Sequence, residues 1–197
     1  MSTRDAIVEA ADKLFYENGF DHTSFAHVAE AVGISRGNFY HHFKSKDEIL
    51  EAVIDRRVSD RLAMLEQWDG VGETPQARLE CFVRLLSTNR EKIRRHGCPL
   101  GTLSSELAKL DHPLGPEAKR LFDLFRSWIR RQIEAFGRIE DADLLALQLL
   151  SMSQGATTLA NVYPDEAILD LEIQRMLDWI ADLTPKPTPQ ADQKEQS

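Results

Sequence analysis

The chain has 197 residues, enough for one large domain or for a small domain joined to a larger one, and Ala, Leu, Glu, Arg and Gln dominate, so helices are favoured and no sheet is needed. Its net charge is −8, and it contains neither a run of about 18 uncharged apolar residues nor a basic leader with an apolar core, which excludes membrane-spanning and secreted classes and predicts a cytoplasmic protein. Two cysteines, Cys81 and Cys98, are too few for a disulfide framework and are expected to be thiols.

A helix is predicted over residues 3–18, with an inward apolar stripe and with Gly19 at its end. A shorter helix follows, and either Thr23 or Ser24 can cap it. Its buried face repeats at helical spacing, in the residues Phe25, Val28, Ala29 and Val32. Gly33 can take the positive φ that ends this helix, so a tight turn is predicted there.

A third helix begins after Ser35, whose hydroxyl can accept a hydrogen bond from its first backbone N–H groups. Two helices joined by a turn of about three residues are typical of helix-turn-helix proteins. Phe39 and Phe43 lie one turn apart and would anchor the third helix to the core. The side chains left to face outward are Arg36, Gly37, Asn38, Tyr40, His41 and Lys44.

Positive charge is concentrated in this segment. Residues 33–46 contain Arg36, Lys44 and Lys46 and no Asp or Glu, whereas residues 1–50 contain 5 Lys and Arg against 8 Asp and Glu. Because an acidic surface repels a phosphate backbone, this segment must supply the attractive field. The pattern predicts double-stranded DNA as a partner; the alternative is an ordinary capped surface helix.

The N-terminal block resembles the TetR family of transcriptional repressors over about residues 3–55. The resemblance rests on the segments Ala10-Ala11-Asp12-Lys13-Leu14-Phe15, Asn18-Gly19-Phe20, Thr23-Ser24 and Ile34-Ser35-Arg36-Gly37-Asn38-Phe39-Tyr40-His41-His42-Phe43. It implies an all-α homodimer with an N-terminal three-helix helix-turn-helix DNA-binding domain and a C-terminal helical domain for effector binding and dimerisation. We expect these domains over residues 1–46 and 47–183, with a Pro-rich disordered tail over residues 184–197.

The resemblance also implies roles for single residues. Ser35, Tyr40 and Lys46 match positions that contact phosphate, while Arg36, Asn38 and His41 match positions facing base edges or the groove wall. Arg suits guanine and Asn suits adenine. The predicted DNA-binding set is Thr23, Ser24, Ser35, Arg36, Gly37, Asn38, Tyr40, His41, Lys44 and Lys46. Gly37 leaves room for close approach, and His42 either packs beside Phe43 or contacts DNA.

A long fourth helix is predicted from Asp47 and Glu48 to about Glu66 or Trp68, followed by a break over residues 69–75. A fifth helix is predicted from Pro75 to about His96, and its basic end contains Arg90, Lys92, Arg94 and Arg95. Two interpretations of that end stay open: cations that complement the helix dipole, or a second anion site that helps an acidic effector to enter.

The turn Gly97-Cys98-Pro99-Leu100-Gly101 separates the basic helix end from a new helix predicted to be capped near Thr102. Cationic neighbours and a helix N-terminus favour the reactive thiolate, so Cys98 is a candidate sensor of oxidants or electrophiles. The alternative is a small buried core residue. A similar turn occurs in a subset of TetR-like regulators, some of which respond to electrophiles.

Three more helices are predicted, from Pro113 or Pro116 to Phe136, from Asp141 to about Ala160, and from about Asp165 to Leu183. The last two are apolar nearly all round, which predicts a four-helix homodimer interface. The resemblance places an effector pocket among the middle helices, and its expected lining is Phe82, Leu86, Cys98, Leu103, Phe125, Trp128, Gln132, Met152, Gln154 and Thr158.

The predicted function is that of a TetR-type repressor, released from a near-palindromic operator by a small molecule or a thiol-reactive effector. An enzyme is the first competing class, but no Gly-rich phosphate loop, His-Glu-x-x-His, nucleophile elbow or Cys-x-x-Cys is present, and adjacent His41 and His42 point apart. No cofactor or metal is therefore expected. A helical protein-interaction scaffold is the second competitor, and it leaves the concentrated charge of the third helix unexplained.

Overall fold

A computed structural model describes residues 2–163 and 165–183, so the predicted tail lies outside the described residues. Every regular element in this part of the chain is an α-helix, which confirms the all-α class. The helices are α1 (Thr3–Asn18), α2 (Phe25–Val32), α3 (Arg36–His42), α4 (Lys46–Val71), α5 (Pro75–Thr88), α6 (Arg90–His96), α7 (Pro99–Lys109), α8 (Gly115–Glu134), α9 (Ala142–Val162) and α10 (Ala167–Leu183).

The N-terminal helices begin at serine caps. Ser24 accepts from His27 N at 3.2 Å, Ser35 from Asn38 N at 3.3 Å and Ser45 from Glu48 N at 3.1 Å. Gly33, at φ 71°, ends α2 in the left-handed conformation and donates its N–H to Glu30 O. The turn between α2 and α3 is therefore built as the sequence predicts.

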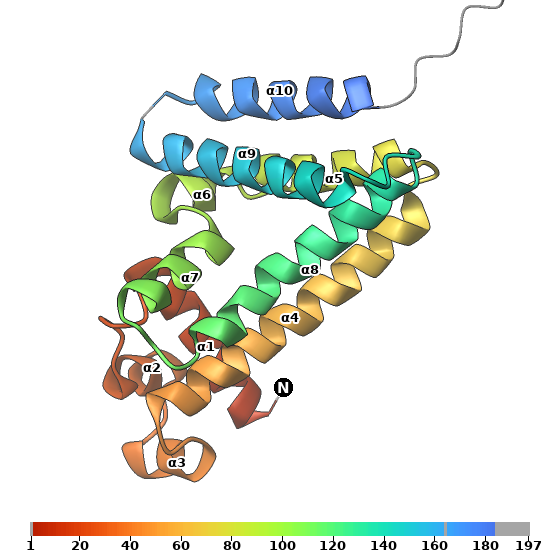
Figure 1. Cartoon of the computed structure of the whole chain (residues 1–197). Helices are drawn as coiled ribbons and strands as arrows, with labels where there is room; N and C mark the ends of the chain where they lie inside the picture. The colour runs from red at the N-terminus through yellow and green to blue at the C-terminus, as the bar shows by residue number, and fades with distance from the viewer. Residues whose placement is uncertain (1, 164, 184–197) are drawn as a thin grey trace, which may run out of the picture.

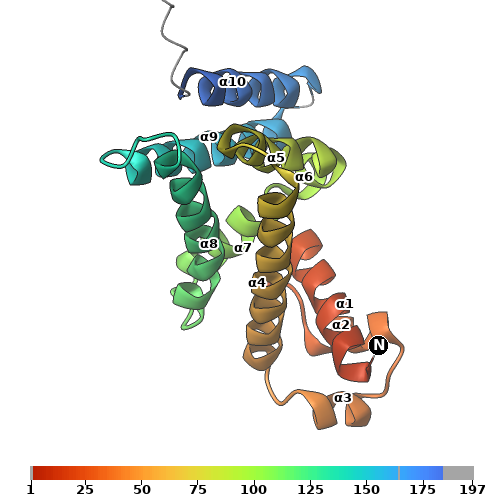
Figure 2. The same ribbon diagram turned by 90° about the vertical axis from the view of Figure 1, so that its right-hand side faces the viewer.

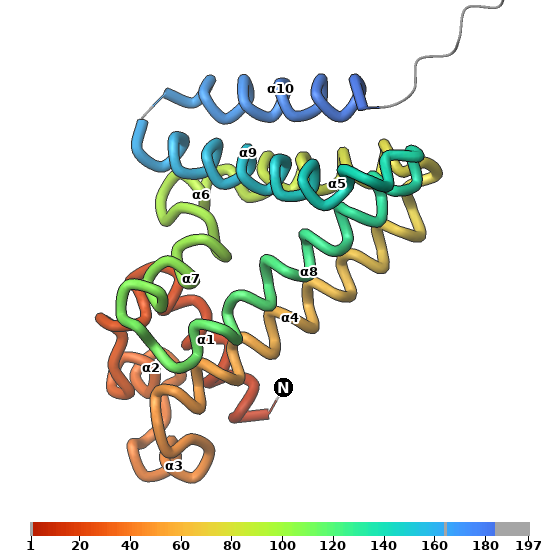
Figure 3. The backbone as a smooth tube through the Cα atoms, in the orientation of Figure 1, coloured from red at the N-terminus to blue at the C-terminus, as the bar shows by residue number. Residues whose placement is uncertain are grey.

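The helices form an elongated arrangement with α3 at one end and α10 at the other (Figures 1 and 2). The long helices α4 and α8 contact each other and connect the two ends. The tube in Figure 3 shows α9 and α10 running side by side across the end away from α3, and α10 also packs against α5. Helix α4 thus reaches from the end of the molecule that contains α3 to the end that contains α5, α9 and α10.

Two apolar clusters hold this arrangement together. The first joins α1, α2, Phe39 and Phe43 to the first turns of α4, and it continues onto Leu103 of α7 and Leu121 of α8. The second lies among α5, α8, α9 and α10 around Trp128. The boundary between residues 46 and 47 stays a prediction, and apolar packing runs across it without interruption.

The fourth helix is longer than predicted, because it continues through Gly70 and ends at Val71. Tertiary contacts hold its last turn. Trp68 packs against Trp128 with ring centroids 5.5 Å apart, and Asp69 accepts from Trp128 Nε1 at 3.0 Å. These contacts outweigh the low helix propensity of one glycine, about 1 kcal/mol relative to alanine.

The single helix predicted from Pro75 to His96 is two helices, divided at Asn89. The Asn89 side chain donates to Leu85 O at 2.9 Å, and so competes for a carbonyl at the end of α5. The prediction of a cap near Thr102 is also wrong. Cys98 is the N-cap of α7 and Pro99 its first residue, while Thr102 sits in the first turn with its hydroxyl donating to Cys98 O.

The last three helices agree with prediction within a few residues. Helix α8 ends at Glu134 rather than Phe136, α9 extends to Val162, and α10 begins at Ala167. Differences of this size are usual at helix ends, where the last turn frays and few contacts hold it.

Candidate nucleic-acid interface and effector cavity

Helix α3 separates apolar anchors from an exposed polar face. Phe39 and Phe43 are 1% and 2% exposed and belong to the N-terminal apolar cluster. The opposite side of the same segment is solvent-facing, and the predicted DNA-binding residues exposed there are Ser35, Arg36, Gly37, Asn38, Tyr40, His41 and Lys44. The anchors fix the orientation of α3, so these side chains share one side of the molecule.

Aromatic contacts position the outermost side chains of this face. The Phe25 ring packs edge-on against Phe39, with centroids 5.1 Å apart, and lies 5.6 Å from the ring of Tyr40. Tyr40 is still 47% exposed, so its hydroxyl is available to a partner. Ser24, Arg36 and Tyr40 line one surface hollow of about 290 Å³ between α2 and α3.

Thr23 is a correction to the predicted DNA-binding set. Its side chain is 1% exposed, and its hydroxyl donates to Gly19 O at 2.7 Å. The competing cap, Ser24, is the residue that begins α2 and is exposed. The hydroxyl of Thr23 is thus used inside the protein, where it holds the turn after α1, and its side chain does not reach DNA.

Two lysines beside α3 already hold internal bonds. Lys46 Nζ donates to Phe20 O at 3.0 Å and Asp21 O at 3.3 Å, and it lies 4.1 Å from the centroid of the Phe20 ring. Lys44 Nζ donates to Tyr40 O. An ammonium has three protons, so Lys46 retains one for a phosphate without leaving its partners. His42 is half-buried, and its two interpretations stay open.

A small cavity of about 70 Å³ lies in the body among helices α4 to α9. Five of the ten predicted effector residues line it: Phe82, Leu86, Cys98, Phe125 and Gln154. Its volume is well below the roughly 300–1,000 Å³ typical of sites for drug-sized ligands. The cavity of this conformation is therefore contracted, and a larger molecule must widen it.

The other five predicted effector residues do not line this cavity. Leu103 packs in the N-terminal cluster, Met152 against the second cluster, and Thr158 is exposed with its hydroxyl on Gln154 O. Trp128 Nε1 and Gln132 Nε2 both donate to Asp69 Oδ1, at 3.0 and 3.2 Å. Gln132 is buried, but it holds the end of α4 through Asp69 instead of facing the cavity.

Several lining residues were missed. The polar ones are Arg61, Asn89, Ser153 and Thr157, and the apolar ones are Leu85, Ile93, Pro99, Leu100, Phe122 and Leu150. Ser153 and Thr157 lie one turn apart and flank Gln154 on an otherwise apolar helix, so helical spacing could have identified them. Arg61 belongs to a long charged helix, and its sequence context offers no signal.

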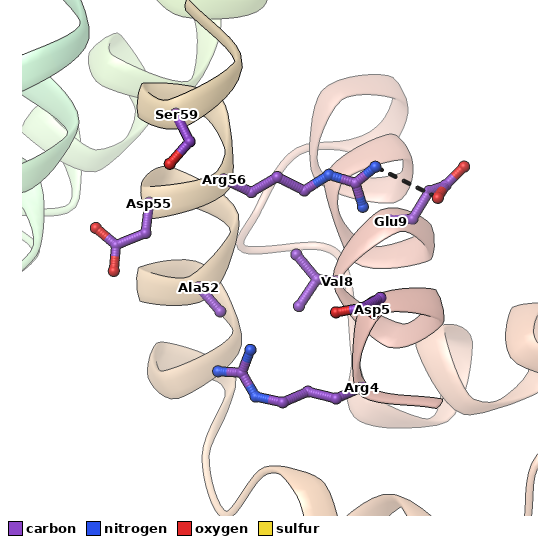
Figure 4. A pocket seen from close by; sticks show the side chains of 8 residues that line it. All are labelled: Arg4, Asp5, Val8, Glu9, Ala52, Asp55, Arg56 and Ser59. Atoms are coloured by element: carbon purple, nitrogen blue, oxygen red, sulfur yellow. Dashed lines mark hydrogen bonds and ion pairs between the residues drawn. The ribbon is translucent and has the colours of Figure 1, made fainter. Parts of the chain in front are cut away.

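A second surface hollow, of about 470 Å³, lies along the seam between α1 and α4 (Figure 4). Arg56 of α4 and Arg4 of α1 reach across it from opposite sides, with Val8 between them. Arg56 is paired with Glu9 at 3.4 Å, so its charge is already compensated. The hollow is open and mixed in charge, and it holds no predicted site residue.

The two helices predicted to form the dimer interface carry exposed apolar side chains. Leu144 and Val162 of α9 are 69% and 67% exposed, and Leu147 and Leu159 of α9, Tyr163 directly after it and Leu171 of α10 are also exposed. These side chains are available to a protein partner.

Comparisons with known proteins agree with this geometry. The model of bacterial regulatory proteins of the tetR family matches residues 7–53, and the LmrA/YxaF-like transcriptional-regulator C-terminal domain matches residues 75–175. The chain belongs to the TetR family. It is a helix-turn-helix transcriptional regulator with a TetR-type DNA-binding domain and an LmrA/YxaF-like C-terminal domain.

Relatives of this TetR-family chain align over most of its length. An uncharacterized HTH-type transcriptional regulator in the lacX 3′ region of Lactococcus lactis is 29% identical, with 86% of this chain and 88% of the relative aligned. The HTH-type transcriptional repressor DhaR of a Mycobacterium species is 25% identical over 78% and 79%. A TetR regulator structure from Legionella pneumophila superposes with a TM-score of 0.81 at 24% identity, covering 94% and 98%, and shares the fold.

In this TetR-family chain, α7 links the cavity to the DNA-binding domain. Cys98 and Pro99 line the cavity where α7 begins. Further along α7, the Glu106 carboxylate accepts from Phe20 N at 2.8 Å and Asp21 N at 2.9 Å, in the turn between α1 and α2. A displacement of α7 therefore moves the support of the turn that precedes α2.

A second set of bonds joins the same regions beside the cavity. Arg57 of α4 donates to Asp12 of α1 at 2.6 Å and to Pro99 O at 2.8 Å. Tyr16 donates its hydroxyl to Gly97 O at 2.8 Å. Burial, together with the nearby Cys98 thiol, raises the pKa of Tyr16 to about 12. The phenol thus stays protonated and remains a donor at neutral pH.

Among the helices described for this TetR-family chain, none combines the length and apolar character needed to cross a membrane. Within residues 2–163 and 165–183, no three side chains of His, Cys, Asp or Glu come together as a metal site would require.

Proposed function

We propose that the protein is a transcriptional repressor that binds a near-palindromic operator as a homodimer and leaves it when an effector occupies the cavity. The exposed polar face of α3, held by Phe39 and Phe43, is the observation that carries this proposal. Membership of the TetR family supports it, and one aligned relative, DhaR, is itself named a repressor.

The DNA contacts divide into two kinds. We assign phosphate contacts to Ser24, Ser35, Tyr40, Lys44 and Lys46, because hydroxyl and ammonium groups suit phosphate oxygens. We assign contacts with base edges or the groove wall to Arg36, Asn38 and His41, with Gly37 leaving room for the DNA backbone or a base edge. All of these side chains except that of the half-buried Lys46 are exposed in the free protein.

The homodimer forms through α9 and α10 in this proposal. A two-fold axis that pairs these helices buries the exposed apolar side chains of both copies and builds a four-helix interface. Light scattering of the full chain at micromolar concentration tests it. Leu147→Glu with Leu171→Glu is expected to give monomers, and Leu110→Glu, an equally exposed position after α7, to stay dimeric.

Release follows from the links between cavity and DNA-binding domain. An effector that needs a wider cavity favours a conformation in which α7 and α4 have moved, and the bonds of Glu106 and Arg57 transmit that movement to α1 and α2. The effector must bind this conformation better than the DNA-bound one, because only differential affinity shifts a population.

The decisive experiment selects genomic fragments with the purified, reduced protein at physiological salt and sequences what stays bound. Enrichment of a shared near-palindrome supports the proposal. If no fragment is enriched at any salt concentration, the proposal is wrong and the helical protein-interaction scaffold is favoured instead. Tyr40→Ala and Lys46→Ala are expected to weaken all fragments alike, whereas Asn38→Ala also relaxes the base preference. Unchanged operator affinity in all three variants would remove the contact assignments.

A thiol-reactive effector is the second candidate, because Cys98 lines the cavity and is only half-buried. An electrophilic alkene would form a C–S bond at Sγ, and the thiol proton would pass to the neighbouring carbon. Cys98→Ser is expected to keep operator binding and to lose release by electrophiles; Cys81→Ser, on α5 and outside the cavity lining, is the control. Release that persists in Cys98→Ser would exclude the thiol mechanism.

A further inference from the structure

Arg61 of α4 is a half-buried cation at the cavity, and it forms no ion pair with any carboxylate among the residues that the structure describes. Its Nε is inaccessible to solvent and has no hydrogen-bond partner, and its Nη1 has Met64 Sδ as its hydrogen-bonding neighbour, at 3.9 Å. The arginines just before it on α4 are compensated: Arg56 by Glu9 and Arg57 by Asp12.

This arrangement is energetically unfavourable in the unoccupied protein. The Nε donor is inaccessible to solvent and has no acceptor, so it loses hydration that nothing replaces. Burial lowers the pKa of Arg61, and the neighbouring Arg57 cation lowers it further, against the opposing influence of Asp60 and Asp12. A guanidinium nevertheless stays charged at neutral pH, so the site holds an unmatched positive charge.

The rest of the cavity lining is amphipathic. Phe82, Phe122 and Phe125 supply aromatic surface, and Ser153, Gln154 and Thr157 supply polar groups on one side of α9. The Ser153 and Thr157 hydroxyls donate to Leu150 O and Gln154 O, so their oxygens are left as acceptors. Aromatic walls with one cation match an organic anion that has an apolar ring or chain.

A route to this cation is present. A surface groove of about 910 Å³ between the DNA-binding domain and the body shares Arg61, Asn89 and Pro99 with the cavity. Six arginines and lysines and four carboxylates line the groove, and Lys92 and Arg95 come from the basic end of α6. The excess of positive charge there attracts an anion toward Arg61.

From these observations we propose that the effector is an amphipathic organic carboxylate whose acidic group pairs with Arg61. The inference rests on the proposed function, since it names the chemical class of the effector for the same cavity. It also explains why the anion would act on DNA binding, because Arg61 lies on the helix that begins with Lys46 beside α3. A bidentate carboxylate supplies the acceptor that Nε lacks.

Matched pairs of acids and neutral amides test the charge requirement: 4-hydroxybenzoate and its amide, cinnamate and cinnamamide, octanoate and octanamide. The full-length protein is titrated with each by thermal unfolding and by calorimetry. At tenfold its Kd, a binding acid is expected to raise the unfolding temperature by about 3–6 °C, and its amide is not. Binding by no acid in the panel, or equal binding by acid and amide, overturns the proposal.

Substitution at Arg61 tests the assignment. Arg61→Gln is expected to weaken acid binding at least ~30-fold, and Arg61→Lys less. Arg84→Gln, an exposed arginine on α5 outside the cavity and the groove, should bind as the wild type does. Acid binding that survives Arg61→Gln unchanged places the anion elsewhere and overturns the proposal.

A test without ligand uses Arg61→Met, which keeps most of the side-chain volume and removes the charge. Because an inaccessible Nε without an acceptor is unfavourable, the free variant is expected to unfold at a temperature equal to or above that of the wild type. Marked destabilisation would show that Arg61 is a structural residue. Operator release distinguishes the failure of this proposal from the failure of the proposed function. If a neutral molecule releases the operator and Arg61→Met does not change that release, the carboxylate proposal is wrong and the repressor proposal stands. If the protein binds acids but no operator can be found, the repressor proposal is wrong and the carboxylate proposal stands.

Discussion

The exposed face of α3 and the cavity of the body are constructed in opposite ways. The face has its polar groups on the outside of the segment from Ser35 to Lys44, where water can reach them. The cavity is lined by a half-buried cation and several polar side chains around about 70 Å³, which is too small for a drug-sized ligand. In the proposed mechanism the face of α3 is ready in the free protein, whereas the cavity needs a conformational change.

The strongest way to sharpen this contrast is to remove one aromatic anchor from each region. Phe39→Ala is expected to lower the free energy of unfolding by about 3–5 kcal/mol and to abolish operator binding, because α3 loses its anchor. Phe125→Ala, beside the cavity, is expected to cost stability at the lower end of that range and to keep operator binding. Denaturant unfolding and operator titration measure both. Equal loss of DNA binding in the two variants would contradict the division of roles.

The next effect concerns the bonds between the regions. Arg57→Ala removes a buried guanidinium that joins α1, α4 and the first residue of α7, and is expected to cost about 2–3 kcal/mol. Arg56→Ala, its exposed neighbour on the same helix, should cost under about 1 kcal/mol. If denaturant unfolding gives the two variants the same free energy of unfolding, the bonds of Arg57 do not stabilise the contact between α1, α4 and α7.

A smaller and more selective effect is expected at Gly37. A Cβ built there meets no atom within 4 Å, and the position is helical, so Gly37→Ala should stabilise the free protein by up to about 1 kcal/mol. The same methyl group occupies the space assigned to DNA, and operator affinity should fall. Gly70→Ala, equally open on α4, is the control that should gain stability and keep affinity. A tight operator complex of Gly37→Ala would show that DNA does not approach this residue closely.

An effect of similar size is expected at Tyr16, and it depends on pH. Its pKa is raised from 10.0 to about 12, so the folded state favours the protonated phenol. That stabilisation is complete below pH 10 and declines as the pH rises from 10 to about 12. Tyr16→Phe should lose about 1 kcal/mol at neutral pH, with the bond to Gly97 O, and the difference from wild type should shrink in that alkaline window. A constant difference across the window would contradict this account.

The sequence predicted the face of α3 better than it predicted the cavity. The caps Ser24 and Ser35, the turn glycine Gly33 and the anchor Phe39 are decided by neighbours within one or two turns, so local pattern is sufficient for them. The prediction that Thr23 is exposed for DNA was wrong. Thr23 and Ser24 can both cap a helix, and only the packing of the turn decides that Ser24 is the cap and Thr23 is buried. The assignment of contacts to DNA stays a prediction.

The cavity could be predicted only in part, because residues from six helices meet there. Apolar spacing identified Phe82, Leu86 and Phe125 as inward-facing, but it could not tell which side of Trp128 or Gln132 faces the end of α4. Arg61 was missed since a lone arginine on a charged helix gives no sign of burial. Long-range packing decides these positions, as it also decides that α4 continues through Gly70.

The contracted cavity has a consequence for how sensitively the protein responds. In the proposed mechanism an effector must supply the free energy of widening the cavity, so its apparent affinity equals the intrinsic affinity multiplied by the fraction of molecules with a wide cavity. Leu86→Val adds space at the cavity and is expected to raise that fraction. Side-chain volume at the cavity would then set the effector concentration at which the proposed repressor leaves its operator.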